Sequence, residues 1–139
     1  MTPLVQEART WIGTPFVHQG RTKGAGCDCL GLVVGVLSTF GLEPNIPVYG
    51  DISQIRDKSL FYNGLIDHLK VSHEVLDLGQ ILGFSLRRNF PLAHIGILSQ
   101  LAPIPRFIHA YSTYGVVESA LTDAWQRRIV ARFEFPTGD

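Results

Sequence analysis

The chain has 139 residues, of which 45% are hydrophobic and 17% charged, and its twelve basic and twelve acidic residues cancel. This length predicts a single domain over residues 1–139 with a sizeable buried core. The balanced charge provides no broad field for nucleic acid or an anionic membrane, so we expect neither as a partner. The longest apolar runs fall far short of the ~18 residues that span a bilayer, and the N-terminus lacks a signal-peptide core. We therefore expect no membrane insertion, and synthesis in the cytoplasm without an export signal.

The first half of the chain predicts helices separated by loops. Thr2 and Pro3 are typical of a helix start, and Gly41 is typical of a helix end. The predicted elements are a helix from Thr2 to Ile12, a loop over 13–26, a helix from Cys29 to about Phe40, a loop over 43–57 and a helix over 58–69.

The second half changes character, because short apolar and partly β-branched runs replace the helical spacing. Helices followed by strands predict an α+β domain in which the N-terminal helices pack on a central antiparallel sheet of about five strands. The predicted elements are strands over 80–86, 93–99, 107–111, 116–119 and 129–135, with one or two helical turns over 121–128.

Cys27 and Cys29 are the two cysteines of the chain, and they lie too close in sequence to form a disulfide readily. Each is a candidate for a buried apolar residue, a nucleophile or a metal ligand. Asp28 is suited to cap the second helix, which places Cys29 in the first turn, where the helix dipole favours thiolate. The Asp28 charge opposes this effect, and Cys27 is expected to be a core residue.

Gly31 and Gly35 lie four residues apart on one face of that helix. Each costs about 1 kcal/mol relative to Ala, so close approach of the helix to the sheet is the expected reason for them. Such packing would hold the Cys29 turn rigidly over the strands.

His94 and His109 each lie within a strand-like apolar run. If the hairpin turn between them is centred between Leu101 and Ala102, the two histidines stand directly opposite each other, with Cβ atoms roughly 4.5–5.5 Å apart. The imidazoles would then be within hydrogen-bonding reach, and Gly96 would leave room for the second helix or for substrate. The arrangement predicts a thiol nucleophile, a base in His94, and His109 fixing the tautomer of that base.

Four short motifs follow one another along the chain: Gly13-Thr14-Pro15-Phe16, Asp28-Cys29-Leu30-Gly31, His94-Ile95-Gly96-Ile97 and Ile108-His109-Ala110. In this order and spacing they resemble the NlpC-type peptidoglycan cysteine peptidases, a papain-like family. The resemblance covers about residues 5–135 and implies the papain-like fold with the triad Cys29, His94 and His109. It also implies cleavage of cell-wall stem peptides, commonly beside D-glutamate and diaminopimelate. We expect no cofactor.

Further motifs are similar to the short peptidases of phage tails and gene transfer agents. This likeness implies tail-hub or baseplate proteins as partners, and a particle that delivers the enzyme to the target cell's periplasm. The motifs are His18-Gln19-Gly20, Gly26-Cys27-Asp28-Cys29-Leu30-Gly31-Leu32, His109-Ala110-Tyr111 and Gly115-Val116-Val117-Glu118-Ser119.

The sequence departs from the family pattern at Phe16, where relatives carry a Tyr thought to assist near the oxyanion. We expect Phe16 and Asp28 to lie in the vicinity of the substrate and the oxyanion. His18 is expected either to line the cleft or to lie on a surface loop. Leu30 replaces the common Ser, although the phage-tail subgroup often has Leu there. Gln80 replaces a frequent Asp, and we expect a minor effect.

Three alternatives remain open from the sequence. Cys27, Cys29, His94 and His109 could together bind zinc, although a single residue between the two cysteines is an uncommon ligand spacing. The chain could also be a structural component of a tail hub with a weak or inactive site. A papain-like acyltransferase, in which an amine captures the acyl-enzyme, is the third.

Overall fold

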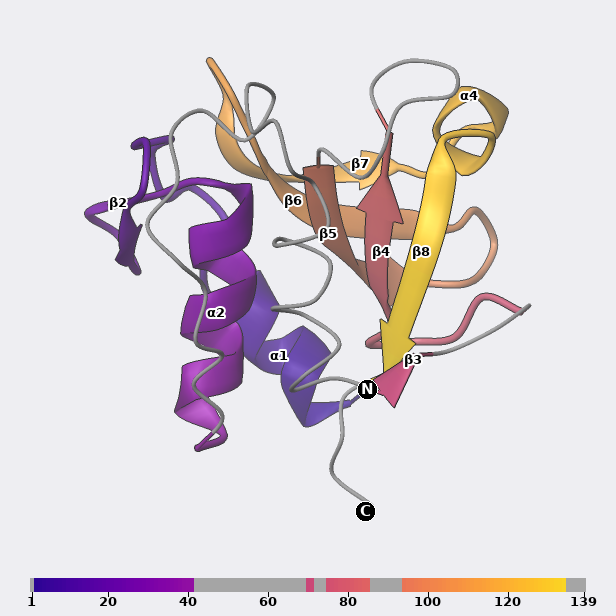
Figure 1. Ribbon diagram of the computed structural model, residues 1–139, viewed down its shortest axis with the longest axis horizontal. Coiled ribbons are helices and arrows are strands. Elements are labelled where there is room, and N and C mark those ends of the chain that lie inside the picture. The colour runs from indigo at the N-terminus through magenta and orange to yellow at the C-terminus, as the bar shows by residue number, and fades with distance from the viewer. Residues whose placement is uncertain (1, 42–69, 72–74, 86–93, 135–139) are drawn as a thin grey trace.

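The computed structural model describes residues 2–41, 70–71, 75–85 and 94–134. In these segments α1 and α2 lie on one side of an antiparallel sheet, and α4 leads into the last strand (Figure 1). The predicted α+β class is therefore confirmed. The helices are α1 (Pro3–Arg9), α2 (Cys29–Thr39) and α4 (Asp123–Gln126).

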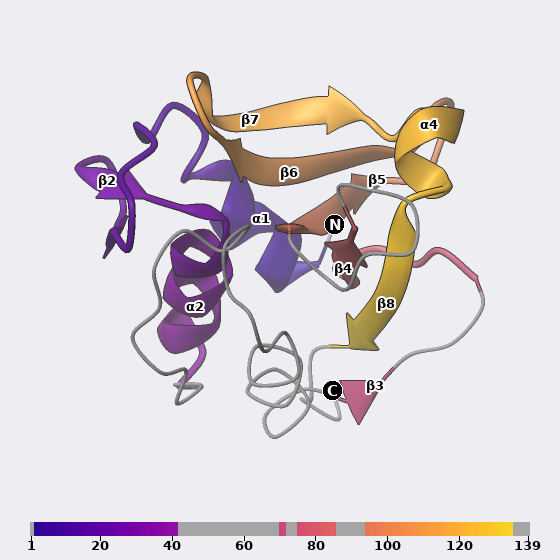
Figure 2. The same ribbon diagram turned by 45° about the horizontal axis from the view of Figure 1, so that its top comes forward.

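The sheet has six described strands in the order β3-β8-β4-β5-β6-β7, and every neighbouring pair is antiparallel. Five of them match the five predicted strands, whereas the two-residue edge strand β3 was not predicted. A view turned by 45° shows β6 and β7 running side by side across the sheet (Figure 2). The strands are β3 (Lys70–Val71), β4 (Ile81–Phe84), β5 (His94–Gln100), β6 (Arg106–Tyr111), β7 (Gly115–Ala120) and β8 (Ile129–Glu134).

The predicted glycine-rich loop contains a small ladder of its own. Strand β1 (Arg21–Thr22) pairs antiparallel with β2 (Gly26–Cys27), and the chain then turns into α2. A single parallel bridge joins Phe16 to Cys27 on the other side. These contacts fix the loop against the start of α2, so the segment before the candidate nucleophile is built as regular structure.

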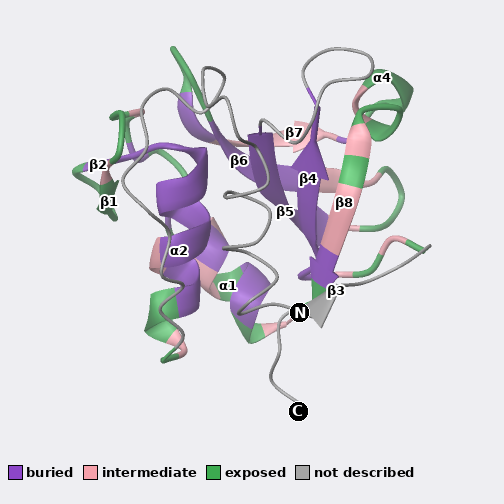
Figure 3. Ribbon diagram, viewed as in Figure 1, coloured by how far each residue is buried: buried purple, intermediate pink, exposed green. Residues whose placement is uncertain are grey.

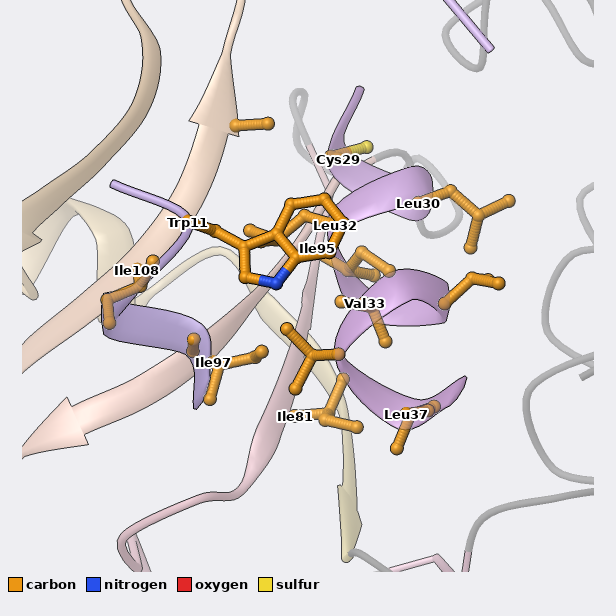
Figure 4. Packing of buried hydrophobic residues seen from close by; sticks show 14 of the residues in the cluster. Trp11, Cys29, Leu30, Leu32, Val33, Leu37, Ile81, Ile95, Ile97 and Ile108 are labelled. Carbon is orange, nitrogen blue, oxygen red and sulfur yellow. The ribbon is translucent and has the colours of Figure 1, made fainter. Parts of the chain in front are cut away.

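The central strands are buried on both faces, as the purple ribbon of β4, β5 and β6 shows (Figure 3). One hydrophobic cluster lies between the sheet and α2, and its strand members include Ile95 and Ile97 (Figure 4). Because side chains alternate along a strand, His94, Gly96 and Leu98 point to the opposite face. Leu98 belongs to the second cluster there, with Leu82, Phe84, Phe107 and Leu121, against which Trp125 packs.

The helix ends follow their capping residues. The Thr2 hydroxyl accepts a hydrogen bond from the Val5 amide at 3.1 Å, which confirms the predicted start of α1. The helix ends at Arg9, however, so Ile12 lies outside it and is 44% exposed. Helix α2 ends where predicted, with Phe40 as its C-cap and Gly41 at a φ of 81°.

The predicted loop over 43–57 and the predicted helix over 58–69 lie outside the described residues. Among the described helices, none combines the length and apolar content needed to cross a lipid bilayer.

Candidate active site

Cys29 is the first residue of α2, and Asp28 is the N-cap that the sequence predicted. One carboxylate oxygen of Asp28 accepts from the Gly31 amide at 2.8 Å, as expected of a helix cap. The other oxygen accepts from the amide of Gln19, also at 2.8 Å. Asp28 therefore links the glycine-rich loop to the first turn of α2.

The two helix glycines make room for neighbours other than the predicted one. A Cβ at Gly31 would collide with the carbonyl oxygen of Gly20, and a Cβ at Gly35 would collide with the ring of Trp11. Trp11 lies directly against α2 in Figure 4. The expectation that these glycines let the helix approach the sheet is therefore wrong: they admit the loop before β1 and the segment after α1.

The sulfur of Cys29 lies in a buried environment that holds it as a thiol. Burial, together with the negative charge of Asp28, raises the pKa of Cys29 to about 12. The backbone amides of Ile95, Leu30 and Cys29 lie close enough to the sulfur to lower its pKa, but their effect is smaller. Burial therefore outweighs the effect that the sequence predicted for the start of the helix, and the predicted opposition of Asp28 acts in the same direction as burial.

The nearness of the Ile95 amide also locates the candidate nucleophile. Ile95 follows His94 directly at the beginning of β5. The Cys29 sulfur thus lies near the peptide unit that joins His94 to Ile95, whereas the His94 ring itself lies on the other face of the sheet, beside Phe84 and Trp125. Figure 4 shows Cys29 at the end of α2, with Ile95 in the same group of packed residues.

His94 and His109 are in direct contact. The Nε2 atom of His94 lies 2.8 Å from Nδ1 of His109, with both rings buried. The predicted hydrogen-bonding reach is confirmed, but the predicted register is wrong. Strand β5 pairs Ile97 with Ile108, so continuing this register places His109 opposite Gly96 and leaves His94 as its diagonal neighbour.

Gln100 pairs with Arg106, which centres the hairpin turn near Pro103. A bulge in β5 between Leu98 and Gln100 then shifts the pairing back by one residue. The observed register also changes the expected role of Gly96. A Cβ there would lie 2.9 Å from the Phe107 ring and 3.1 Å from Cβ of His109. Gly96 therefore leaves room for the side chains of β6, which corrects the expectation that the room served α2 or substrate.

Aromatic rings enclose the two imidazoles on their face of the sheet. The His109 ring stacks on Phe107 with a centroid separation of 4.1 Å and on Tyr111 at 5.4 Å. Trp125 lies edge-on to His109 at 5.6 Å and tilted against His94 at 5.8 Å. These rings fix the orientation of both imidazoles.

Both histidines are held neutral. Burial lowers the pKa of His94 to about 4. Burial and the neighbouring His94 lower the pKa of His109 to about 3. Each ring therefore carries one N–H and one unprotonated nitrogen near neutral pH, and can donate one hydrogen bond and accept one.

The remaining predicted site residues have structural surroundings. Phe16 is partly buried and packs on the core cluster that contains Cys29. His18 is exposed, and its Nε2 lies 3.5 Å from the side-chain nitrogen Nε2 of Gln19. This favours the expectation that His18 lies on a surface loop. Cys27 is fully buried as expected, and burial raises its pKa to about 12. Gln80 closes the turn before β4 by donating to the Val75 carbonyl at 3.2 Å.

Two residues of the site were missed by the sequence reasoning. The first is Trp125, whose ring lies beside both histidines. Ser119 was noted only as part of a motif, yet its hydroxyl lies 2.9 Å from Nε2 of His109. The pairing of β6 with β7 brings Ser119 near, and a register between strands cannot be read from one strand alone.

The zinc hypothesis gains no support from the geometry. Within the described part of the chain, no three His, Cys, Asp or Glu side chains are grouped so that they could hold a metal ion. The mutual contact of His94 and His109 also occupies one nitrogen of each ring.

Comparison with curated proteins and solved structures gives one consistent result, although no family model matches the chain. The gamma-DL-glutamyl hydrolase of Bacillus subtilis (strain 168) is 29% identical over 135 residues, which are 95% of this chain and 29% of that protein. An NLP/P60 family protein from Staphylococcus aureus superposes over 97% of this chain and 41% of its own, with a TM-score of 0.64 and 22% identity.

Two further structures agree. An NlpC/P60 family protein from Bacillus cereus covers 96% of this chain and 39% of its own, with a TM-score of 0.67 and 18% identity. The NlpC/p60 domain of the peptidoglycan hydrolase SagA covers 94% of this chain and 95% of its own, with a TM-score of 0.59 and 21% identity. The chain has the NlpC/P60 fold, which confirms the fold implied by the sequence motifs, and it spans less than a third of its curated relative.

Proposed function

We propose that this chain, which has the fold of the NlpC/P60 domains, belongs to that family and hydrolyses peptide bonds in the stem peptides of peptidoglycan. Cys29 is the nucleophile, His94 the base, and His109 the residue that orients the base. The observation that carries the proposal is the 2.8 Å contact between Nε2 of His94 and Nδ1 of His109, on a strand whose Ile95 backbone lies near the Cys29 sulfur.

The ring nitrogens of His94 have separate tasks in this mechanism. Its Nε2 faces His109, which leaves Nδ1 to receive the thiol proton. Because Cys29 and His94 both rest neutral, this proton moves as the sulfur attacks the carbonyl carbon. The backbone N–H at the start of α2 is suited to hold the resulting oxyanion.

The reaction then proceeds in two halves. The tetrahedral intermediate expels the amine, which takes the proton from His94, and a thioester to Cys29 remains. Water next gives a proton to His94 and attacks the thioester carbonyl. The thiolate leaves, recovers that proton, and frees the new carboxylate.

The substrate proposal is a bond made by a glutamyl residue of the stem peptide. Its support is the curated relative, whose name describes hydrolysis at gamma-DL-glutamyl linkages, together with SagA, described as a peptidoglycan hydrolase. Delivery by a phage-tail-like or gene-transfer-agent particle belongs to the same proposal and rests on the resemblance of the motifs around Cys29 and His109.

The test is mass analysis of the muropeptides released from diaminopimelate-type walls. We expect new amine termini within stem peptides and intact glycan strands, lost in Cys29→Ala and in His94→Ala. Cys27→Ala is the matched control, because Cys27 is equally buried but lies in β2, and it should retain activity. Cut glycan with intact stems would reject the specificity, and equal inactivity of wild type and Cys29→Ala would favour a structural component of a tail hub.

A pair of synthetic peptides refines the substrate. The two peptides differ only in whether glutamate is linked through its γ- or its α-carboxyl group. We expect cleavage of the γ-linked peptide alone; preference for the α-linked peptide would contradict the proposed bond.

A further inference from the structure

Ser119 extends the contact between the two histidines by one more group. The hydroxyl oxygen of Ser119 lies 2.9 Å from Nε2 of His109, and Nδ1 of His109 lies 2.8 Å from Nε2 of His94. Three side chains from β5, β6 and β7 thus form one line of hydrogen bonds across the sheet. The proposed mechanism assigns roles to His94 and His109 but none to Ser119.

The protons on this line can be arranged in two ways. If His94 is protonated at Nε2, it donates to His109 Nδ1, and His109 must carry its own proton at Nε2 and donate to Ser119. If the order is reversed, Ser119 donates to His109, which donates to His94. His94 then carries its proton at Nδ1 and cannot accept one from a thiol.

Only the first arrangement is competent for the proposed chemistry, and it requires an acceptor at the position of the Ser119 oxygen. His109 is 1% exposed and its ring faces are stacked on Phe107 and Tyr111, so the ring cannot turn toward another partner. A buried N–H without an acceptor is rarer and more costly in proteins than an under-satisfied acceptor. Loss of the hydroxyl would therefore penalise the competent tautomer more than the reversed one.

The strand that carries Ser119 is held from its other face. Glu118 accepts a hydrogen bond from Arg9 of α1 at 2.8 Å and from the Ser99 hydroxyl at 2.6 Å. Because neighbouring residues of a strand point to opposite faces, this anchor fixes β7 while Ser119 faces the histidines.

We propose that Ser119 is a positioning residue, whose oxygen accepts from Nε2–H of His109 and so keeps Nδ1 of His94 unprotonated and available as the base. This role rests on the proposed function for its consequence in catalysis, but the tautomer it assigns to His109 does not depend on activity.

The direct test is nitrogen-15 NMR of the imidazoles in the full chain, at neutral pH. We expect Nε2 of His109 to be the protonated nitrogen and Nδ1 the unprotonated one in the wild type. In Ser119→Ala the two signals should move toward each other as the tautomers mix, and Ser119→Thr should restore the wild-type pattern. A wild type protonated at Nδ1, or an Ala variant with unchanged signals, would overturn the inference.

Ser99→Ala is the matched control, because it removes a hydroxyl contact to β7 on the face away from the histidines. It should leave the imidazole signals unchanged, and a change like that of Ser119→Ala would mean that the strand, and not the hydroxyl, sets the tautomer. If Ser119→Ala does not fold, the wild-type tautomer and the Thr variant still decide the outcome.

Activity gives the second readout. We expect Ser119→Ala to lower kcat by about tenfold with little change in KM. We also expect it to lower the apparent pKa of the acidic limb of the pH–rate profile. The reason is that His109, without the Ser119 hydroxyl, accepts less strongly from the protonated His94. A changed KM with an unchanged kcat would contradict positioning. If the wild type releases no stem-peptide termini, the proposed function fails, while the NMR result still decides the tautomer.

Discussion

His94 and His109 hydrogen-bond to each other as diagonal neighbours of β5 and β6, not as a directly opposed pair. Diagonal positions lie roughly 7–8 Å apart at the backbone, a separation that two imidazole rings can bridge end to end. The contact joins Nε2 of His94, the ring nitrogen farther from its backbone, to Nδ1 of His109, the ring nitrogen nearer to its backbone. It therefore leaves Nδ1 of His94, close to the strand backbone, for the thiol.

Replacement of His109 tests whether it acts by orienting His94. His109→Ala should lower kcat at least about a hundredfold, because His94 loses the acceptor that fixes its tautomer. His109→Gln should retain much more activity, since its amide oxygen can accept from Nε2–H. Steady-state kinetics on the γ-linked peptide provides the measurement. Equal activity of the Ala and Gln variants would argue against a hydrogen-bonding role.

The thiol should react as a neutral group and not as part of an ion pair. The pKa of Cys29 is raised to about 12 and that of His94 lowered to about 4, so the thiolate fraction is small near neutral pH. In a Cys27→Ala background, the rate of alkylation by iodoacetamide should rise about tenfold per pH unit from neutral into the alkaline range. A plateau in this rate between about pH 5 and pH 8 would instead reveal a stable thiolate–imidazolium pair.

Protein stability should fall on acidification within a defined window. The two histidines have folded pKa values of about 4 and about 3, below the unfolded value of 6.5. Unfolded chains therefore bind more protons below about pH 6.5, and the free energy of unfolding decreases until the pH reaches the folded values. Urea denaturation between pH 7 and pH 4 measures this slope, and His109→Gln should make it shallower. An unchanged slope would show that these histidines do not cause the acid sensitivity.

The free energy of unfolding should also decrease at alkaline pH, here because of the two cysteine thiols. Both thiols have pKa values raised from 9.0 to about 12, so above about pH 9 the unfolded chain loses protons that the folded chain keeps. Stability should therefore fall as the pH rises past 9. The Cys27→Ala variant should lose part of this dependence.

Gly31→Ala tests the packing of the loop against α2. The added methyl group would collide with the carbonyl of Gly20, which is backbone and cannot move aside as a side chain could. We expect a loss of about 1–3 kcal/mol in the free energy of unfolding, with reduced activity because the Cys29 turn shifts. Ser38→Ala, at an exposed position of the same helix, should cost little. A stable and fully active Gly31→Ala would show that the loop yields without moving the thiol.

The sequence could predict those parts of the molecule that local chemistry decides. Asp28 and Gly41 bound α2 because caps act within a few residues, and the apolar runs from Ile81 to Phe133 become strands because both faces of the central sheet are covered. The identity of the histidine pair also followed from strand patterns.

What could not be predicted depends on contacts between distant segments. The hairpin turn is centred near Pro103, and a bulge at Ser99 shifts the pairing back by one residue, so the register beside His109 differs by two residues from the predicted one. The high pKa of Cys29 arises from burial, which is a property of the assembled core. The neighbours of Gly31 likewise come from a loop eleven residues earlier in the chain, at Gly20.

Asp28 has two opposing effects on the start of α2: its hydrogen bonds order the backbone there, and its charge makes the Cys29 thiol less reactive. One carboxylate fastens two stretches of backbone, at Gln19 and Gly31, and its negative charge simultaneously discourages ionisation of the adjoining sulfur. The same side chain thus keeps the thiol in place and keeps it dormant. A thiol restrained in this way stays protonated, and protonation shields it from electrophiles and oxidants.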